Sequence, residues 1–403
     1  MSRATDAEKP EPVPFGKPSL GVAEEDAVLR VMRSGWLTTG SECRSFEQEF
    51  ARAVDMPHAI AVSSATAGLH LALEAAGVKP GDRVVTTPLT FAATAEVICS
   101  LGADPVFADI DPDTGNISAE RAAHAVEQSQ AAALIPVHLG GLTCQMQPLQ
   151  AIASGYRCSL IEDAAHSFPG GDEHGYAGTQ SDFGVYSFYA NKTITTGEGG
   201  MVVTRDTAAA RRMQLLRNHG IDRDVWHRFT DTRASWRYDI TAAGFKYNMP
   251  DLAAAIGRVQ LGKARELQQK RRAIANRYLN ELRDCEFLQL PPDAPDHSYH
   301  LFQIRLRTGI LSIDRDEFIN RLQQQGIGTS VHYIPLHIMS YYRDRYDLKP
   351  SDFPHALDWY ERCISLPIYP DLEDSQIDRI LDAVRGIGRS CLKGLTASSN
   401  RQA

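Results

Sequence analysis

Several kinds of protein are excluded by what this 403-residue sequence lacks. It contains no apolar run of about eighteen residues, so we expect no helix that spans a membrane and no membrane partner. Its seven cysteines include no C-x-x-C pair, which argues against a disulfide framework and a zinc site, and no metal is expected. The net charge of −8 argues against nucleic acid as a partner, because a phosphate backbone is bound by a basic face.

The two ends of the chain carry few structural signals. The first ten residues are charged and have no apolar core of a signal peptide, and Pro10, Pro12 and Pro14 follow. We therefore expect flexible tails over residues 1–15 and 396–403. Together with scattered, reduced cysteines, this pattern is typical of a cytoplasmic protein.

Strand and helix patterns alternate through the first two thirds of the chain. This alternation predicts an α/β fold, in which a mostly parallel sheet with crossover helices forms a large domain over residues 16–262. A helix over 250–282 is expected to bridge to a smaller C-terminal α+β domain over 263–395. That domain is predicted to contain a strand over 300–306, a helix over 315–325, a strand after Gly326 and a final helix over 375–389.

Lys192 stands out because of its surroundings. Apolar runs at 185–188 and 201–204 predict two short buried strands, and the turn between them contains Gly197, Gly199 and Gly200. A lysine on a tight loop between buried strands can form an imine with a carbonyl compound. The alternative is an ordinary solvated lysine.

Two acidic residues follow another predicted strand, over 159–161. Glu162 and Asp163 stand where this strand ends, and ligands of open α/β sheets collect at the carboxyl ends of strands. A carboxylate there can keep a ring nitrogen protonated, which pyridoxal phosphate requires to act as an electron sink. Asp163 could equally cap a short helix.

The segment 59–73 predicts a strand that leads through small hydroxylated residues into a helix. Small side chains at a helix start leave backbone N–H groups open to an anion, and the helix dipole adds positive potential. No G-x-G-x-x-G fingerprint or Walker-type lysine is present, so the pocket suits one phosphate monoester better than a dinucleotide. An ordinary capped helix is the alternative.

Together these segments supply a phosphate cup, a ring-nitrogen carboxylate and an imine lysine, in this order along the chain. With its motifs in this order, the sequence resembles a known family. It is similar to the DegT–StrS type sugar-nucleotide aminotransferases, which are fold-type-I pyridoxal phosphate enzymes. The resemblance extends from the segment 34–40 to the segment 363–369. Its anchor motifs lie at residues 64–68, 90–94, 161–166, 187–192, 197–200, 245–249 and 326–333.

The resemblance implies roles around the cofactor ring. Lys192 would form the imine and carry protons, and Asp163 would pair with the ring nitrogen. His166 would lie near the ring or its phenolic oxygen. Phe91 would stack on the electron-poor ring, with pyridoxamine phosphate as the alternate form of the cofactor.

The resemblance also implies how the phosphate is held. Ala65 and Thr66 would bind it through backbone amides and a hydroxyl, with help from Ser187. Asn248 stands where the partner subunit of these enzymes contributes a phosphate contact. A homodimer with shared active sites is therefore expected.

Substrate contacts are expected from two further places. Trp36 lies in the first resembling segment, and His332 and Tyr333 could face the site from the small domain. His138 and His300 are interpreted as core or interface histidines instead. The aromatic residues within 222–238 suggest either a mobile loop that touches substrate or partner, or a variable surface loop.

By resemblance, the enzyme would move an amino group from glutamate to C4 of a nucleotide-linked 4-keto sugar. The nearest likeness is to the enzymes that form UDP-4-amino-4-deoxyarabinose. Alternatives are an aminotransferase for a C3-keto sugar or a keto-inositol, a non-sugar pyridoxal phosphate aminotransferase, and a non-catalytic regulator. A sugar dehydratase is disfavoured, because those relatives replace the position of Lys192 with histidine.

Overall fold

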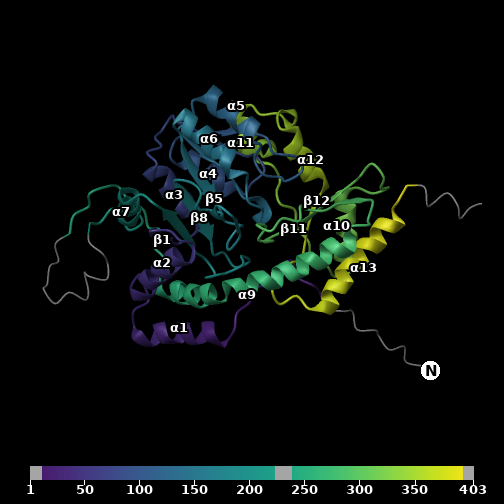
Figure 1. The fold of residues 1–403 in the computed structure, drawn as a ribbon, viewed down its shortest axis with the longest axis horizontal. Coiled ribbons are helices and arrows are strands. Elements are labelled where there is room, and N and C mark those ends of the chain that lie inside the picture. Colours follow the sequence, from purple (N-terminus) through teal and green to yellow (C-terminus); the bar gives the residue numbers. More distant parts are fainter. Residues whose placement is uncertain (1–10, 223–237, 394–403) are drawn as a thin grey trace, which may run out of the picture.

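The computed structural model describes residues 11–222 and 238–393, and Figure 1 shows their arrangement. A large sheet with its helices and a smaller sheet with its own helices are joined along one long helix, α9. Among the described residues, no helix is both long and apolar enough to cross a membrane. The loop proposed for residues 222–238 lies almost entirely outside the described residues, as does the tail over 396–403.

The large sheet has seven strands in the order β1-β9-β8-β5-β4-β2-β3. Only β9 runs antiparallel to its neighbours β1 and β8, while the other pairs are parallel. The predicted α/β fold with a mostly parallel sheet is therefore confirmed. The strands are β1 His58–Val62, β2 Arg83–Thr86, β3 Asp104–Phe107, β4 Ala133–Ile135, β5 Ser159–Asp163, β8 Phe183–Ser187 and β9 Gly200–Thr204.

Both faces of this sheet are covered, because successive side chains of a strand point to opposite faces. In β1, Ile60 packs into a core with helices α3, α4 and α7, whereas Ala61 packs into a core with α2 and α9. Helices α5 and α6 cover the rest of the second face. The helices are α1 Val22–Ser34, α2 Ser41–Ala53, α3 Ala65–Ala75, α4 Ala92–Ser100, α5 Ala119–Ser129, α6 Met146–Tyr156 and α7 Thr207–Leu216.

The smaller sheet has three antiparallel strands, β10 Leu288–Gln289, β11 Phe302–Leu306 and β12 Cys363–Leu366. Helices α10 Arg315–Gln324 and α13 Asp374–Ser390 pack on it around a separate apolar core. Shorter elements between them are α11 Ser340–Tyr346, α12 Pro354–Arg362 and two 3₁₀ turns, Leu336–Ile338 and Pro350–Asp352; another 3₁₀ turn, Leu139–Gly141, follows β4. A two-stranded hairpin, β6 Gly171–Asp172 with β7 Gly175–Tyr176, follows β5.

Helix α9, Asp251–Leu282, spans from the large sheet to the small one (Figure 1). The predicted division between residues 262 and 263 falls inside it, so no loop separates the two parts there. Arg271, near the middle of α9, is 2% exposed. Its Nη1 donates to the carbonyl of Ile368 (2.8 Å), and its Nη2 donates to the carbonyl of Asn191 (3.3 Å).

Two local expectations were wrong. The predicted tail over 1–15 does not hold for residues 11–15, because Val13 is buried and pairs with Ile327 through backbone hydrogen bonds. The strand predicted after Gly326 is absent from the described residues. Only isolated bridges form there, at Ile327 and at Ser330, because each residue finds a partner on a different segment.

Candidate active site

A cavity of about 440 Å³ lies at the carboxyl ends of β5 and β8, beside the starts of α3 and α4. Two segments from the side of the small sheet close it, at His300 and at residues 332–333. The cavity brings together most of the residues that the sequence singled out. They are Ala65, Thr66, Phe91, Asp163, His166, Ser187, Lys192, His332 and Tyr333.

Lys192 sits on a loop that its own backbone holds in place. Its N–H donates to the carbonyl of Tyr189 (3.0 Å), and Tyr189 forms a bridge with Gly197 across the loop. Burial lowers the pKa of the Lys192 amine to about 7; nearby Asp163 opposes this shift, and Arg271 adds to it. A substantial fraction of the amine is therefore uncharged and nucleophilic near neutral pH.

Asp163 ends β5 and points into the same cavity. It is 5% exposed, and Oδ2 accepts a hydrogen bond from the Thr94 hydroxyl (2.8 Å), while Oδ1 accepts the N–H of Ala165 (3.2 Å). Burial raises the pKa of Asp163, although these hydrogen bonds and the Lys192 charge lower it. A buried carboxylate in this position is well placed to pair with a cationic ring nitrogen.

Glu162, one residue earlier, points to the other side of the strand, as alternation requires. It is fully buried, and Oε2 accepts hydrogen bonds from the N–H of Gly178 (2.6 Å) and from Nε2 of His138 (2.9 Å). Oε1 accepts hydrogen bonds from the N–H of Gln180 (2.7 Å) and the hydroxyl of Ser181 (2.8 Å). Of the two carboxylates, Asp163 therefore faces the cavity and Glu162 holds the adjoining loop.

The start of α3 lies where the sequence predicts a phosphate cup. The Ser64 hydroxyl caps the helix by accepting the N–H of Ala67 (3.1 Å), while the N–H groups of Ala65 and Thr66 have no partner in the part of the chain that the structure describes. Such groups at a helix start can bind an anion. Gly200 lies against this turn, because a Cβ there would meet the backbone nitrogen of Ala65 at 2.6 Å. Ser187, at the end of β8, lines the same cavity.

His166 and Tyr333 form a hydrogen-bonded pair at the cavity wall. Nδ1 of His166 accepts the backbone N–H of Gly140 (3.3 Å), so it carries no proton. Burial lowers the pKa of His166 well below its ordinary value, so the ring is neutral with its proton on Nε2. That proton is donated to the Tyr333 hydroxyl (3.0 Å), whose own proton is then available to a ligand.

Phe91 and His332 also line the cavity. Phe91 is 60% exposed, and its ring centroid lies 6.1 Å from that of Tyr333. Nδ1 of His332 lies 2.8 Å from the hydroxyl of Ser365, and its ring stacks on Phe15. Burial, with a smaller effect of the Lys192 charge, lowers the pKa of His332 to about 4, so this ring is neutral.

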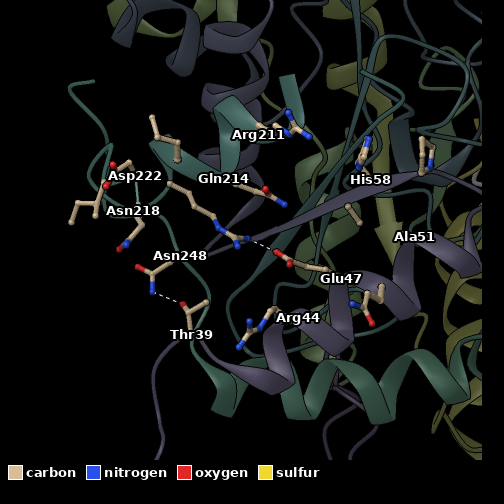
Figure 2. Close-up of a pocket in the computed structure, with 16 residues that line it drawn as sticks. Thr39, Arg44, Glu47, Ala51, His58, Arg211, Gln214, Asn218, Asp222 and Asn248 are labelled. Carbon is tan, nitrogen blue, oxygen red and sulfur yellow. Dashed lines mark hydrogen bonds and ion pairs between the residues drawn. The ribbon is translucent and has the colours of Figure 1, made fainter. Parts of the chain in front are cut away.

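Asn248 and Trp36 lie outside this cavity within one chain. Asn248 lines a different pocket of about 530 Å³, between α2, the start of β1 and α7, where its Nδ2 donates to the Thr39 hydroxyl (2.7 Å; Figure 2). Trp36 is nearby, and its Nε1 donates to the carbonyl of Thr39 (3.3 Å). A single chain therefore does not bring these two residues to Lys192.

His300 was interpreted from the sequence as a core or interface histidine, but it lines the cavity. Its Nε2 lies 3.3 Å from Nζ of Lys192. The strand pattern over 300–306 could not reveal this contact, because it joins segments that are 108 residues apart.

These residues fit pyridoxal phosphate. Open N–H groups at a helix start suit its phosphate, the buried carboxylate of Asp163 suits its ring nitrogen, and the amine of Lys192 suits its aldehyde. Fold and cavity together define the class of the protein, which is a fold-type-I pyridoxal phosphate enzyme.

Comparison with known proteins agrees. The model of the DegT/DnrJ/EryC1/StrS aminotransferase family matches residues 18–385. The spore coat polysaccharide biosynthesis protein SpsC of Bacillus subtilis is 40% identical over 378 residues, which cover 93% of this chain and 97% of SpsC. The chain therefore belongs to the DegT/DnrJ/EryC1/StrS aminotransferase family.

Two solved structures are similar over nearly their whole length. One is Spr1654 from Streptococcus pneumoniae, a proposed sugar aminotransferase that was solved in PMP and PLP forms. Its PMP form is 28% identical to this chain with a TM-score of 0.87, and the match covers 94% of this chain and 99% of Spr1654. PseC of Helicobacter pylori, an aminotransferase involved in the biosynthesis of pseudoaminic acid, is 27% identical with a TM-score of 0.86, covering 94% and 100%. The predicted enzyme class, an aminotransferase of the type that acts on sugars, and its pyridoxal phosphate cofactor are confirmed.

Proposed function

We propose that this enzyme moves an amino group from glutamate to C4 of a nucleotide-linked 4-keto sugar. The observation that carries the proposal is the amine of Lys192, whose pKa is about 7, in one cavity with the carboxylate of Asp163 and the open helix start at Ala65. Family membership and the similarity to SpsC and PseC support a sugar as the amino acceptor.

When bound, pyridoxal phosphate supplies an electron sink for the carbanion that forms when the amino donor loses its α-proton. In the proposed mechanism Lys192 takes this proton at Nζ and later returns it, a role that typically contributes about 10²–10⁴-fold to a rate. Asp163 keeps the ring nitrogen protonated, and the N–H groups of Ala65 and Thr66 hold the phosphate. Phe91 lines the same cavity and would stack on the cofactor ring.

The side of the cavity that faces the small sheet would receive the substrate. His166 is neutral and directs the Tyr333 hydroxyl so that it can donate to an oxygen of the substrate or cofactor. His332 is also neutral, so it does not attract a carboxylate by charge. A ligand rich in hydroxyl groups suits this wall better than a second carboxylate does, which supports a keto sugar over a keto acid.

We also propose a homodimer with shared sites. Neither Asn248 nor Trp36 lines the cavity of Lys192 in its own chain, and Asn248 lines the pocket of Figure 2 instead, which supports a contribution of both residues to the cavity of a partner subunit. A cytoplasmic location is proposed because all seven cysteines are free thiols.

The proposal is tested by incubating the purified enzyme with glutamate and a panel of nucleotide keto sugars, and by mass spectrometry of the products. We expect a mass change from keto to amino sugar, with the amino group at C4. Borohydride should fix the cofactor on a peptide that contains Lys192, and Lys192→Ala should fold but lose this adduct. Fixation on another lysine would contradict the site.

The same panel separates the alternatives. Amination only at C3 or only of a keto-inositol would change the substrate and keep the site. Turnover of keto acids without keto sugars would indicate a non-sugar aminotransferase, and loss of water without amination would indicate a dehydratase.

A further inference from the structure

His300 is fixed where it meets Lys192. Its backbone carbonyl accepts a hydrogen bond from Nη1 of Arg271 (3.3 Å), and its ring lies 4.5 Å from the ring of His166. The His300 side chain is buried, and its Nε2 is 3.3 Å from Nζ of Lys192. Among the described residues, no other side chain or backbone group is within hydrogen-bonding distance of that amine.

The protonation of the His300 ring follows from its contacts. Nδ1 is buried and has no hydrogen-bond partner among the described residues, so nothing on that side of the ring dictates where the proton lies. This differs from His166, whose Nδ1 must accept from Gly140. The ammonium form of Lys192 therefore selects the form of His300 that has its proton on Nδ1 and a bare Nε2, because an ammonium can only donate.

The groups around Lys192 that carry or can carry charge include one carboxylate, one guanidinium and three imidazoles. Asp163 from β5 attracts the ammonium, Arg271 from α9 opposes it, and the rings of His166, His300 and His332 complete the surroundings. Burial lowers the pKa of His300 well below its ordinary value, and the charge of Lys192 lowers it further. The imidazole next to Lys192 is thus neutral.

We propose that His300 is a positioning residue for Lys192 in the transamination. Nε2 of His300 accepts a hydrogen bond from Nζ of Lys192. This bond stabilises and directs the amine whenever the amine is not bonded to the cofactor. The inference rests on the proposed function. No proton passes to the ring. Because one N–H of Lys192 is directed to His300, the lone pair of the uncharged amine points elsewhere. The ammonium form gains a hydrogen-bond acceptor in a buried place where water does not supply one.

The test compares His300→Phe, which keeps an aromatic ring but removes both nitrogens, with His300→Gln, which restores a hydrogen-bonding group. The first readout is the pH dependence of reductive methylation of Lys192 by formaldehyde and cyanoborohydride in the full chain freed of cofactor, followed by peptide mass spectrometry. A hydrogen bond of this length to a charged group corresponds to about one pH unit.

For the wild type we expect half-maximal reaction near pH 7. In His300→Phe the midpoint should fall by about one pH unit, because the ammonium has lost its acceptor. In His300→Gln most of this change should be recovered. His297→Phe is the matched control, since His297 is a buried histidine three residues earlier that does not line the cavity, and it should leave the midpoint unchanged.

The second readout is steady-state kinetics of the loaded enzyme. His300→Phe should lower kcat about tenfold and change KM for the keto sugar less than about twofold, because His300 acts on the amine and not on the substrate. An unchanged or raised midpoint in His300→Phe would overturn the inference, and so would a change confined to KM. Failure of wild-type Lys192 to bind the cofactor would instead overturn the proposed function.

Discussion

Replacing Glu162 with glutamine changes one oxygen for an NH₂ group at the most densely hydrogen-bonded carboxylate near the cavity. The amide oxygen can keep the N–H of Gly178 and Nε2 of His138, which cannot turn acceptor because its Nδ1 already accepts the N–H of Cys144 (3.0 Å). The new NH₂ group then faces the Ser181 hydroxyl and the N–H of Gln180. The hydroxyl can accept from it, because its own proton can go to the carbonyl of Phe183 (2.7 Å), but the N–H of Gln180 cannot.

The cost follows from the one buried donor that loses its acceptor. At about 1–3 kcal/mol for an unsatisfied donor, Glu162→Gln should destabilise the fold by roughly 2 kcal/mol. At about 2 °C per kcal/mol for a long chain, the melting temperature should fall by roughly 4 °C.

The matched control is Asp163→Asn, the same chemical change one residue later. Asp163→Asn should melt close to the wild type but lose most of its turnover, because the amide cannot keep the ring nitrogen protonated. Glu162→Gln should show the reverse, with reduced melting temperature and near-normal turnover well below it. Thermal melting followed by circular dichroism and a turnover assay at low temperature measure both. A Glu162→Gln protein that melts like the wild type would refute the assigned division of roles.

Three further outcomes are expected. Gly200→Ala should weaken pyridoxal phosphate binding about tenfold in an absorbance titration, because its Cβ would displace the helix start at Ala65; equal affinity would contradict the assigned phosphate cup. Tyr333→Phe should lower turnover roughly tenfold while borohydride still fixes the cofactor, since the hydroxyl is lost and the ring is kept. Because burial holds the pKa of Lys192 near 7, against 10.5 when unfolded, cofactor-free protein should gain stability as pH rises between these values. Lys192→Met should remove that gain and melt several degrees above the wild type at pH 6; parallel melting curves would argue against a buried amine.

Much of the large domain was predictable because its strands and helices have strong periodic patterns. The helix predicted within the segment 59–73 is observed as α3, and the predicted helix over 250–282 as α9. Helices α1 and α2 were not predicted. The large apolar side chains of α2 are Phe46 and Phe50, and they stand among many polar residues, so the helical pattern is weak. Their burial depends on contacts with α9.

The candidate site was predictable where one short segment defines a role, as for Asp163, Lys192 and the helix start at Ala65. It was not predictable where the contact joins distant segments. His300 meets Lys192 only after the small sheet has packed against the large one. Glu162 and Asp163 are neighbours in sequence, and only the direction of β5 shows which of them faces the cavity.

Arg271 has a mechanical consequence. One guanidinium ties the loop next to Lys192, the segment before β11 and the segment after β12 to a helix that is roughly 48 Å long. The proposed base and the wall proposed to meet the substrate are thereby attached to one helix. We therefore expect any opening that admits a bulky substrate to come from other segments or from bending of α9, with Lys192 keeping its position relative to the small sheet.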